Sequence, residues 1–199
     1  MDEAHRAYYA ARAREYDDWW LGRGLFAARD RPGWPEEVHE LERLLAALPP
    51  ARTLDAACGT GFLTRHLRGL VVGLDQSPEM CALAQRRLRD GVVVVGDALE
   101  LPFPDRAFDR VVAGHFYGHL LGDQRERFLA EARRVGDELV VIDSARREGI
   151  EDEQWQERKL NDGSRHRVYK RFFRGQALVA EVGGGEVLHD GAWFVVVRS

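Results

Sequence analysis

The stretch LDAACGTG, residues 54–61, decides the fold of this 199-residue chain. Two glycines and a threonine follow an aspartate and two alanines, directly after a short apolar run. A backbone this bare serves either a tight strand-to-helix turn or a ligand that comes within van der Waals reach of the main chain, because glycine has no Cβ atom to collide. The eight residues alone leave both interpretations open, so the downstream sequence has to separate them.

Short apolar strands alternate with helical segments from residue 52 onward. The strands are predicted over 52–57, 70–75, 92–97, 108–114 and 138–144. They are rich in β-branched residues and apolar on both faces, which is typical of a parallel sheet covered by helices. The helices are predicted over 36–48, 61–69, 76–91 and 122–135. The sequence therefore predicts an α/β, doubly wound architecture.

Both ends of the chain depart from this alternation. Residues 3–20 form one alanine-rich segment that predicts a single helix. Two polar–apolar runs around NDGS predict a hairpin over 155–173. A short helix and two strands joined at HDG then predict an antiparallel closure of the sheet. We expect one domain over 1–199, with a hairpin-like insertion at 146–173 before the closing helix and strands.

Composition narrows the classes of function. Hydrophobic residues make up 45% and charged residues 31% of the chain, and the net charge is -4, which gives no general attraction for nucleic acid. The start MDEAHRAYYA lacks the pattern of a signal sequence, and no apolar run is long enough to span a membrane. Cys58 and Cys81 lack metal-ligand spacing, so no metal is expected. We expect a cytoplasmic protein, as a monomer or a homodimer.

Asp75 is the first clue that a ligand binds at the glycine stretch. It lies 20 residues after Asp55, at the end of the second predicted strand, where a carboxylate can accept both ribose hydroxyls of an adenosine. Alone, an aspartate at the end of a strand is more often a solvated cap or turn residue than a ligand-binding residue. Its distance from the glycines favours a ligand-binding residue here. The third glycine of a dinucleotide fingerprint would fall at Thr64, so a dinucleotide is not favoured.

Three ordered motifs resemble the class I S-adenosylmethionine-dependent methyltransferases, in their small-molecule, methyltransferase type 11-like branch. LDAACGTG resembles the first motif of that family, and VVGLDQSPEM (71–80) is similar to its second-strand segment. Residues 96–120 resemble the segment with the third and fourth strands. The resemblance covers 36–145, and 174–199 by topology. It implies a Rossmann-like seven-stranded sheet, mostly parallel with an antiparallel C-terminal strand, and S-adenosyl-L-methionine as the cofactor.

The resemblance also implies roles for single residues. Asp55 would order the loop and approach the methionine amino group, and Asp75 would hold the ribose hydroxyls. Asp97 would accept a hydrogen bond from the exocyclic amine of adenine, although a turn cap is the alternative. The other implied cofactor-binding positions are Ala57, Gly59, Gly61, Gln76, Ala98, Gly114, His115 and Tyr16.

The segment GHFYGHLL (114–121) carries the candidate catalytic residues, His115 and His119. Histidine titrates near neutral pH, so either residue could take a proton from the acceptor. The alternative is that His119 only begins a helix and points outward. The implied enzyme moves a methyl group to an O, N or S atom of a small-molecule acceptor. An RNA or protein methyltransferase, or a non-catalytic subunit that binds an adenosyl ligand, are the competing interpretations.

Two further segments have open interpretations. In the resembling family the N-terminal helix often closes over the cofactor, so residues 1–34 are expected to form a helical lid; alternatively, their aromatic residues only pack on the sheet edge. The hairpin 155–173 is basic and aromatic. It is expected to bind an acidic or aromatic substrate or a second subunit, or else to present a solvated basic face.

Overall fold

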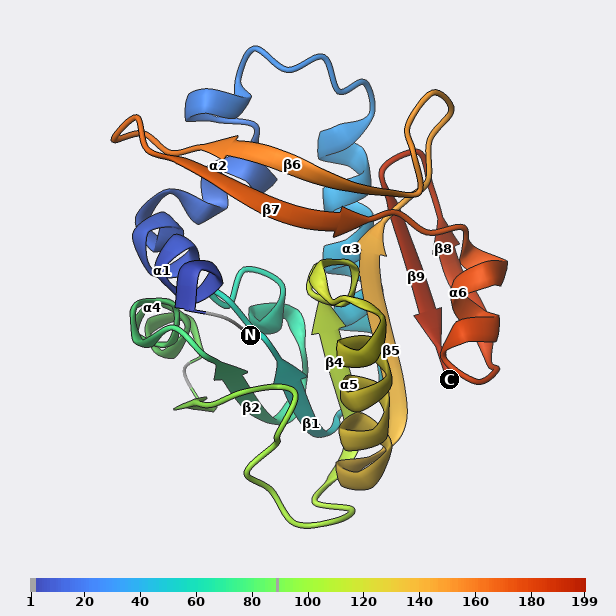
Figure 1. The fold of residues 1–199 in the computed structure, drawn as a ribbon. Coiled ribbons are helices and arrows are strands. Elements are labelled where there is room, and N and C mark those ends of the chain that lie inside the picture. Colours follow the sequence, from blue (N-terminus) through green and yellow to red (C-terminus); the bar gives the residue numbers. More distant parts are fainter. Residues whose placement is uncertain (1–2, 89) are drawn as a thin grey trace.

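A seven-stranded sheet forms the centre of the computed structural model, which describes residues 3–88 and 90–199 (Figure 1). The strand order is β3-β2-β1-β4-β5-β9-β8. The strands are β1 (Ala51–Ala56), β2 (Gly69–Asp75), β3 (Val92–Val95), β4 (Phe108–Gly114), β5 (Gly136–Ser144), β8 (Glu186–Asp190) and β9 (Phe194–Arg198). Strands β1 to β5 pair in parallel, and β9 runs antiparallel to both of its neighbours. The predicted fold is therefore confirmed, including the antiparallel C-terminal strand.

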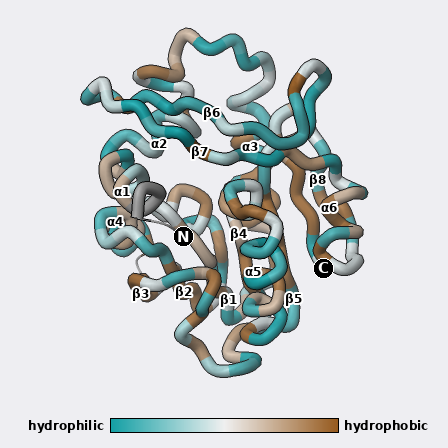
Figure 2. Tube along the Cα trace, in the orientation of Figure 1, coloured by the Kyte–Doolittle hydropathy of each residue, from teal (hydrophilic) through white to brown (hydrophobic). Residues whose placement is uncertain are grey.

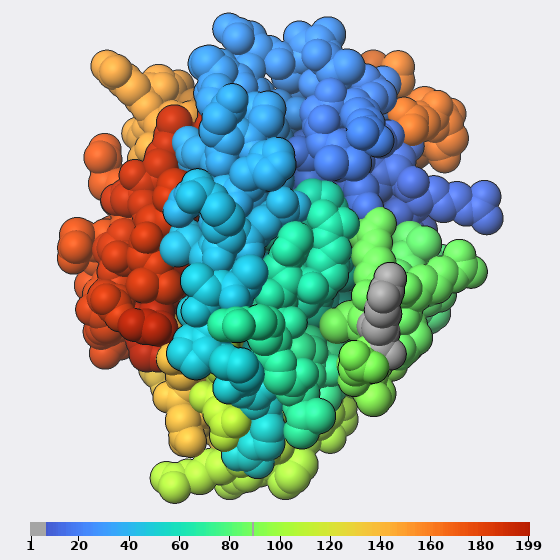
Figure 3. Space-filling view, turned by 180° about the vertical axis from the view of Figure 1, so that it is seen from behind, coloured from blue at the N-terminus to red at the C-terminus, as the bar shows by residue number. Residues whose placement is uncertain are grey.

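Helices cover both faces of the sheet because its strands are apolar on both sides. Successive residues point to opposite faces, so Val111 packs in the cluster with α5 (Gly122–Val135) and α6 (Gly175–Glu181). Val112 packs in the opposite cluster, with α3 (Trp34–Ala47). Figure 3, seen from behind, shows the N-terminal segment and α3 in blue between the C-terminal part of the chain and the green segment around α4. The result is three layers, with the sheet in the middle.

Two predicted helices form where their capping and apolar signals place them. In α3, Pro35 lies in the first turn, and Val38, Leu41 and Leu45 are buried. In α4 (Pro78–Arg87), the Ser77 hydroxyl accepts a hydrogen bond from the backbone N–H of Met80 at 3.2 Å. This second helix was predicted to run to residue 91, whereas α4 ends at Arg87; residue 89 lies outside the described residues.

The predicted helix over 61–69 is wrong. Only a 3-10 turn, η3 (Thr64–His66), forms there, and Gly69 already belongs to β2. The Thr64 hydroxyl donates to Asp55 at 2.6 Å, and Leu67 turns to extended backbone. The eight residues 61–68 thus return the chain to the sheet after a single turn, which leaves no room for a longer helix.

The N-terminal helix predicted over 3–20 is broken in the middle. Helix α1 (Glu3–Arg12) is followed by a 3-10 turn, η1 (Ala13–Glu15), and by α2 (Tyr16–Leu21). At Glu15 the backbone leaves helical geometry, with φ -113° and ψ 6°. A further 3-10 turn, η2 (Gly24–Phe26), leads towards α3. The expected lid begins with Met1 and Asp2, which lie outside the described residues.

The predicted hairpin forms a separate two-stranded sheet of β6 (Glu153–Lys159) and β7 (Arg165–Arg171). It crosses beyond the carboxyl ends of β4 and β5, beside α2 (Figure 1). Figure 2 shows the hairpin as largely hydrophilic, whereas the strands of the central sheet carry most of the hydrophobic segments. A 3-10 turn after β4, η4 (Tyr117–His119), contacts β7. The hairpin and the N-terminal segment therefore meet over the edge of the sheet where its parallel strands end.

Candidate active site

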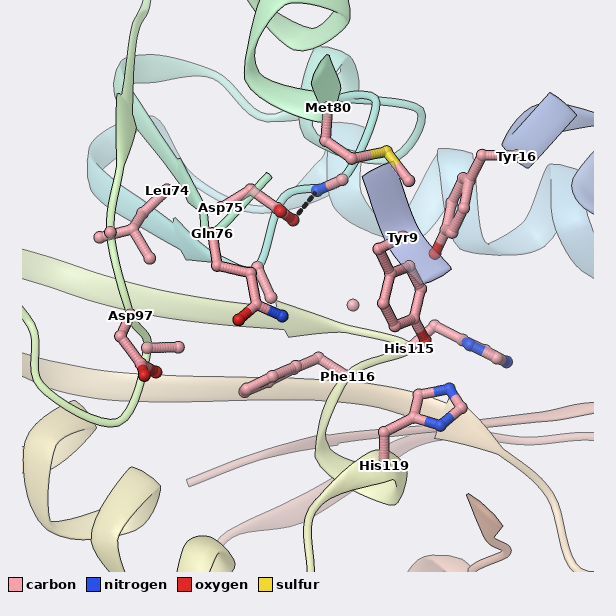
Figure 4. A pocket seen from close by; sticks show the side chains of 15 residues that line it. Tyr9, Tyr16, Leu74, Asp75, Gln76, Met80, Asp97, His115, Phe116 and His119 are labelled. Atoms are coloured by element: carbon pink, nitrogen blue, oxygen red, sulfur yellow. Dashed lines mark hydrogen bonds between the residues drawn. The ribbon is translucent and has the colours of Figure 1, made fainter. Parts of the chain in front are cut away.

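A cavity lies at the carboxyl ends of β1, β2 and β4. In doubly wound sheets this edge is where ligands bind. It is lined by Tyr9, Tyr16, Ala57, Gly59, Leu74, Asp75, Gln76, Met80, Gly96, Asp97, Ala98, Gly114, His115, Phe116 and His119. Figure 4 shows Asp75 and Asp97 on one side of the cavity and the two histidines on the other.

Asp75 joins the glycine loop to the start of α4. One carboxylate oxygen accepts a hydrogen bond from the Gly59 N–H at 3.0 Å, drawn as a dashed line in Figure 4. The other accepts from the Ser77 N–H at 2.9 Å. Burial raises the pKa of this carboxyl group, and the backbone N–H groups act in the opposite direction. Asp75 thus holds two loops in register at the wall of the cavity.

The two glycines of the opening stretch have different structural roles. Gly59 has φ +55° and lines the cavity, facing the Tyr16 ring 3.7 Å from where a Cβ atom would lie. Gly61 has φ +75°, and a Cβ atom there would lie 3.1 Å from the Cα atom of Ala84 in α4. Gly61 therefore permits a tight turn against a helix, and Gly59 brings bare backbone to the cavity, as the ligand interpretation requires.

Asp55 is buried beneath the glycine loop rather than among the residues that line the cavity. One of its oxygens accepts a hydrogen bond from the Thr64 hydroxyl at 2.6 Å, and the other, Oδ1, has no hydrogen-bond partner among the residues that the structure describes. Burial raises the pKa of Asp55 to about 7. An acceptor atom in this state has unused capacity for a donor.

The histidine side of the cavity is built by the turn after β4. His119 donates its Nδ1 hydrogen to the Tyr169 carbonyl at 2.7 Å, so its neutral ring carries the lone pair on Nε2. The His115 ring lies 5.6 Å from that of His119 and shares a hydrogen bond with the Ser144 hydroxyl at 3.1 Å. Burial, helped by Lys170, lowers the pKa of His115 well below its usual range. His115 is therefore neutral at neutral pH.

The backbone at His115 is in the left-handed region, with φ +56°. A non-glycine residue rarely adopts this conformation, which costs about 1–3 kcal/mol and is common at functional sites. The His115 N–H donates to the Ile142 carbonyl of the neighbouring strand at 2.7 Å. The strand pairing thus fixes the direction in which the side chain leaves β4.

The N-terminal aromatic residues divide between the cavity and the core. Tyr16 lines the cavity, and the guanidinium of Arg12 lies 4.7 Å above its ring. Trp20 is buried and stacks on Phe62 at 5.2 Å between ring centroids. The segment is thus anchored by its tryptophans while its tyrosines reach the cavity.

Most of the predicted site residues meet at this cavity. Those that line it are Tyr16, Ala57, Gly59, Asp75, Gln76, Asp97, Ala98, Gly114, His115 and His119. Asp55 and Gly61 support the loop from behind. Leu74, Gly96 and Phe116 were not predicted, although each adjoins a predicted residue in sequence. Met80 was not predicted either, and no sequence signal distinguishes it from a core residue of its helix.

This geometry defines a class of protein. A glycine loop after the first strand, an acidic residue at the end of the second and a Rossmann-like sheet together form a site for an adenosyl ligand. A family model described as "Methyltransferase domain" matches residues 54–138. Residues 54–138 thus resemble the methyltransferase domain of the class I S-adenosylmethionine-dependent family, and the whole chain has the fold of such methyltransferases. The cofactor predicted from the sequence, S-adenosylmethionine, is the cofactor of this family.

Several known proteins are similar to the chain. Demethylmenaquinone methyltransferase of Thermotoga maritima is 39% identical over 107 residues, 51% of this chain and 44% of that protein. Ajmaline N-methyltransferase of Rauvolfia serpentina is 33% identical over 118 residues, 53% of this chain and 40% of that protein. The chain thus spans about half the length of the curated relatives it matches.

A solved structure matches over nearly the whole chain. The DhpI-SAM-HEP complex is 28% identical, with a TM-score of 0.79, and the match covers 98% of this chain and 95% of that one. Among the described residues no helix is long and apolar enough to cross a membrane. The same residues contain no group of three or more histidines, cysteines and acidic residues that could hold a metal ion.

Proposed function

We propose that this chain transfers the methyl group of S-adenosylmethionine to an O, N or S atom of a small metabolite. The observation that supports this most is the polarity of the cavity, with two carboxylates on one side and two histidines on the other. The names of the curated relatives, a quinone and an alkaloid methyltransferase, favour a small acceptor.

The residues present fit the cofactor. Asp75 would hold the ribose hydroxyls, Asp97 the adenine, and the bare backbone at Gly59 would admit the methionine part. Asp55 lies under this loop without lining the cavity, so it would order the loop around the ligand through its hydrogen bond with Thr64. When bound, S-adenosylmethionine supplies a methyl group on a positively charged sulfur that leaves as a neutral thioether.

The protein's task is then to place the acceptor in line with the methyl group and to keep water away. His115 and His119 border this side of the cavity. We propose that one of them takes the acceptor's proton, if the acceptor carries one, because both rings border the cavity where the acceptor would lie. The Tyr169 carbonyl holds His119 in the tautomer that leaves Nε2 as the basic nitrogen.

We also propose that the N-terminal segment closes over the cofactor. Tyr9 comes from α1 and Tyr16 from the start of α2, and both line the cavity from outside the sheet. The hairpin 146–173 would form the other side of the acceptor's entrance. With the N-terminal segment and the hairpin assigned in this way, residues 1–199 would form a single methyltransferase domain.

A labelling experiment tests the activity. The protein is mixed with S-adenosylmethionine carrying a labelled methyl group and with separate fractions of a cell extract: metabolites, RNA and protein. We expect label in the metabolite fraction alone, and much less of it with an Asp75→Asn variant at the same cofactor concentration. Label in RNA or protein would replace the proposed acceptor class. Tight cofactor binding with no label in any fraction would favour a non-catalytic binding subunit.

A further inference from the structure

A second cavity adjoins the cofactor cavity, and His115 lines both. It lies between the N-terminal segment, the end of β5 and the hairpin. Its walls carry five cationic side chains, and no acidic residue lines it. The five are Arg29, Arg31, Arg147, Arg158 and Lys170.

The four arginines have no ionic partner in the described part of the chain: no carboxylate there lies within 4.0 Å of their guanidinium groups. Their partners are neutral. Arg31 donates to the Trp19 carbonyl at 3.1 Å, and Arg158 donates to the side-chain oxygen of Gln156. Lys170, by contrast, pairs with the buried Asp143. The cavity therefore carries an excess of positive charge in a molecule of net charge -4.

Aromatic rings hold two of these guanidinium groups in place. Arg31 lies 3.9 Å above the Trp34 ring, and Arg147 lies 4.2 Å above the Trp193 ring. Stacking on a ring face fixes the plane of a guanidinium and leaves its N–H edge available to a ligand. Burial lowers the pKa of Arg147 and Arg158, and with Arg29 it lowers the pKa of Arg31 to about 10. Glu37 acts on Arg147 in the opposite direction, but burial outweighs it, as expected where buried cations outnumber nearby carboxylates.

We propose that this cavity binds an oxyanion group of the methyl acceptor, and that a doubly charged phosphate- or phosphonate-type group fits it better than a carboxylate. Guanidinium groups form paired hydrogen bonds with such oxyanions, and a second negative charge gains more from several cations. Because His115 lines both cavities, an acceptor bound by its oxyanion in the second cavity would have the rest of its atoms beside the cofactor cavity. The inference rests on the proposed function and narrows its acceptor to small anions.

Calorimetry with inorganic phosphate tests this inference without needing the true acceptor. Phosphate is titrated at low salt into protein saturated with S-adenosylhomocysteine, with acetate and ethylammonium titrated in parallel. We expect phosphate to bind, acetate to bind more weakly and ethylammonium not to bind. Arg147→Gln and Arg158→Gln should each weaken phosphate binding about 10- to 100-fold, the size of one charged hydrogen-bonding group.

The matched control is Arg167→Gln. Arg167 is exposed on β7 of the same hairpin, stacks on Trp155 and does not line the cavity. Its loss removes the same charge and should leave phosphate binding unchanged. An equal loss in the control, no phosphate binding, or tighter binding of acetate than of phosphate would overturn the inference. Binding of S-adenosylhomocysteine separates the two proposals: if it is intact, only the anion site fails, and if it is absent, the proposed function fails.

Discussion

Asp75 is a single side chain on which two loops of the site depend, since its two oxygens accept from Gly59 and Ser77. An Asp75→Asn variant would place an amide donor against one of these N–H groups. We expect S-adenosylhomocysteine to bind about 1.5–3 kcal/mol more weakly, the scale of a lost charged hydrogen bond. Calorimetry measures it, with the exposed Asp137→Asn as control. An unchanged dissociation constant would remove Asp75 from the site.

Asp55 should make the stability of the free protein depend on pH. Its pKa is raised by burial to about 7, so the folded state holds the proton more tightly than the unfolded chain, whose carboxyl titrates near 3.9. The contribution of Asp55 to the free energy of unfolding is therefore full below about pH 4 and is lost as pH rises through about 7. The total loss is on the order of 2–4 kcal/mol.

An Asp55→Asn variant removes this contribution to the pH dependence. Urea unfolding of both proteins at pH 5, 6, 7 and 8 should show the variant gaining on the wild type as pH rises. Parallel stability curves for the two proteins would contradict a raised Asp55 pKa.

Kinetics can distinguish whether His115 or His119 acts as a base or whether both only border the cavity. If one is the base, its replacement by Asn should lower turnover about 10²–10⁴-fold and leave cofactor affinity nearly intact. Because burial lowers the pKa of His115, a rate that depends on it should fall only below about pH 6.5, the ordinary histidine value.

Turnover is measured with the acceptor found by labelling, and the exposed His39→Asn is the control. Full turnover in both His115→Asn and His119→Asn would show that the protein aligns a nucleophile that needs no base. An acceptor oxyanion would be of that kind.

At the scale of elements, the sequence predicted those strands and helices whose bounds depend on local apolar patterns. The strand 108–114 has its predicted bounds, and the stripe of Val38, Leu41 and Leu45 is buried as its spacing indicates. The failures lie where tertiary contacts override the pattern. Thr64 serves Asp55 instead of a longer helix, and α1 ends before η1 with neither glycine nor proline to signal it. No sequence pattern reports that a chain must return to a sheet after one turn.

The N-terminal segment should respond to the cofactor as one element. Tyr9 and Tyr16 line the cavity, whereas Trp20 is anchored in the core. We expect S-adenosylhomocysteine to slow backbone hydrogen exchange in residues 7–16 by about tenfold or more, because closing over a ligand reduces local opening. Helix α6, remote from the cavity, should not change. Equal exchange with and without ligand in residues 7–16 would contradict the lid.

For the whole molecule, ligand binding should appear as thermal stability. S-adenosylhomocysteine at 100 times its dissociation constant adds about 2.7 kcal/mol, which raises the Tm of a domain of this size by about 5–11 °C. NAD at the same concentration should give no shift, because Thr64 replaces the third glycine of a dinucleotide fingerprint. A thermal-shift series compares them. Stabilisation by NAD alone would point to a dehydrogenase-type ligand.

The two halves of the candidate site differed in how far the sequence predicted them. The cofactor half follows from short motifs, since Gly59, Asp75 and Asp97 each end or follow a strand. The cationic cavity could not be predicted, because Arg31 and Arg158 are distant in sequence and meet only through packing. The basic hairpin was noticed, but Arg167 faces away from the cavity while Lys170 is buried in its wall.

The cations of the second cavity share one further property: all five lie outside residues 54–138, the part that matches the family model. His115 alone belongs to both regions. If the second cavity holds the acceptor as proposed, its segments can accumulate substitutions without disturbing the nucleotide site, so the two halves are free to evolve at different rates. A designer could by the same logic graft new sequences at 27–34 and 146–173 and change what is methylated while keeping the methyl donor.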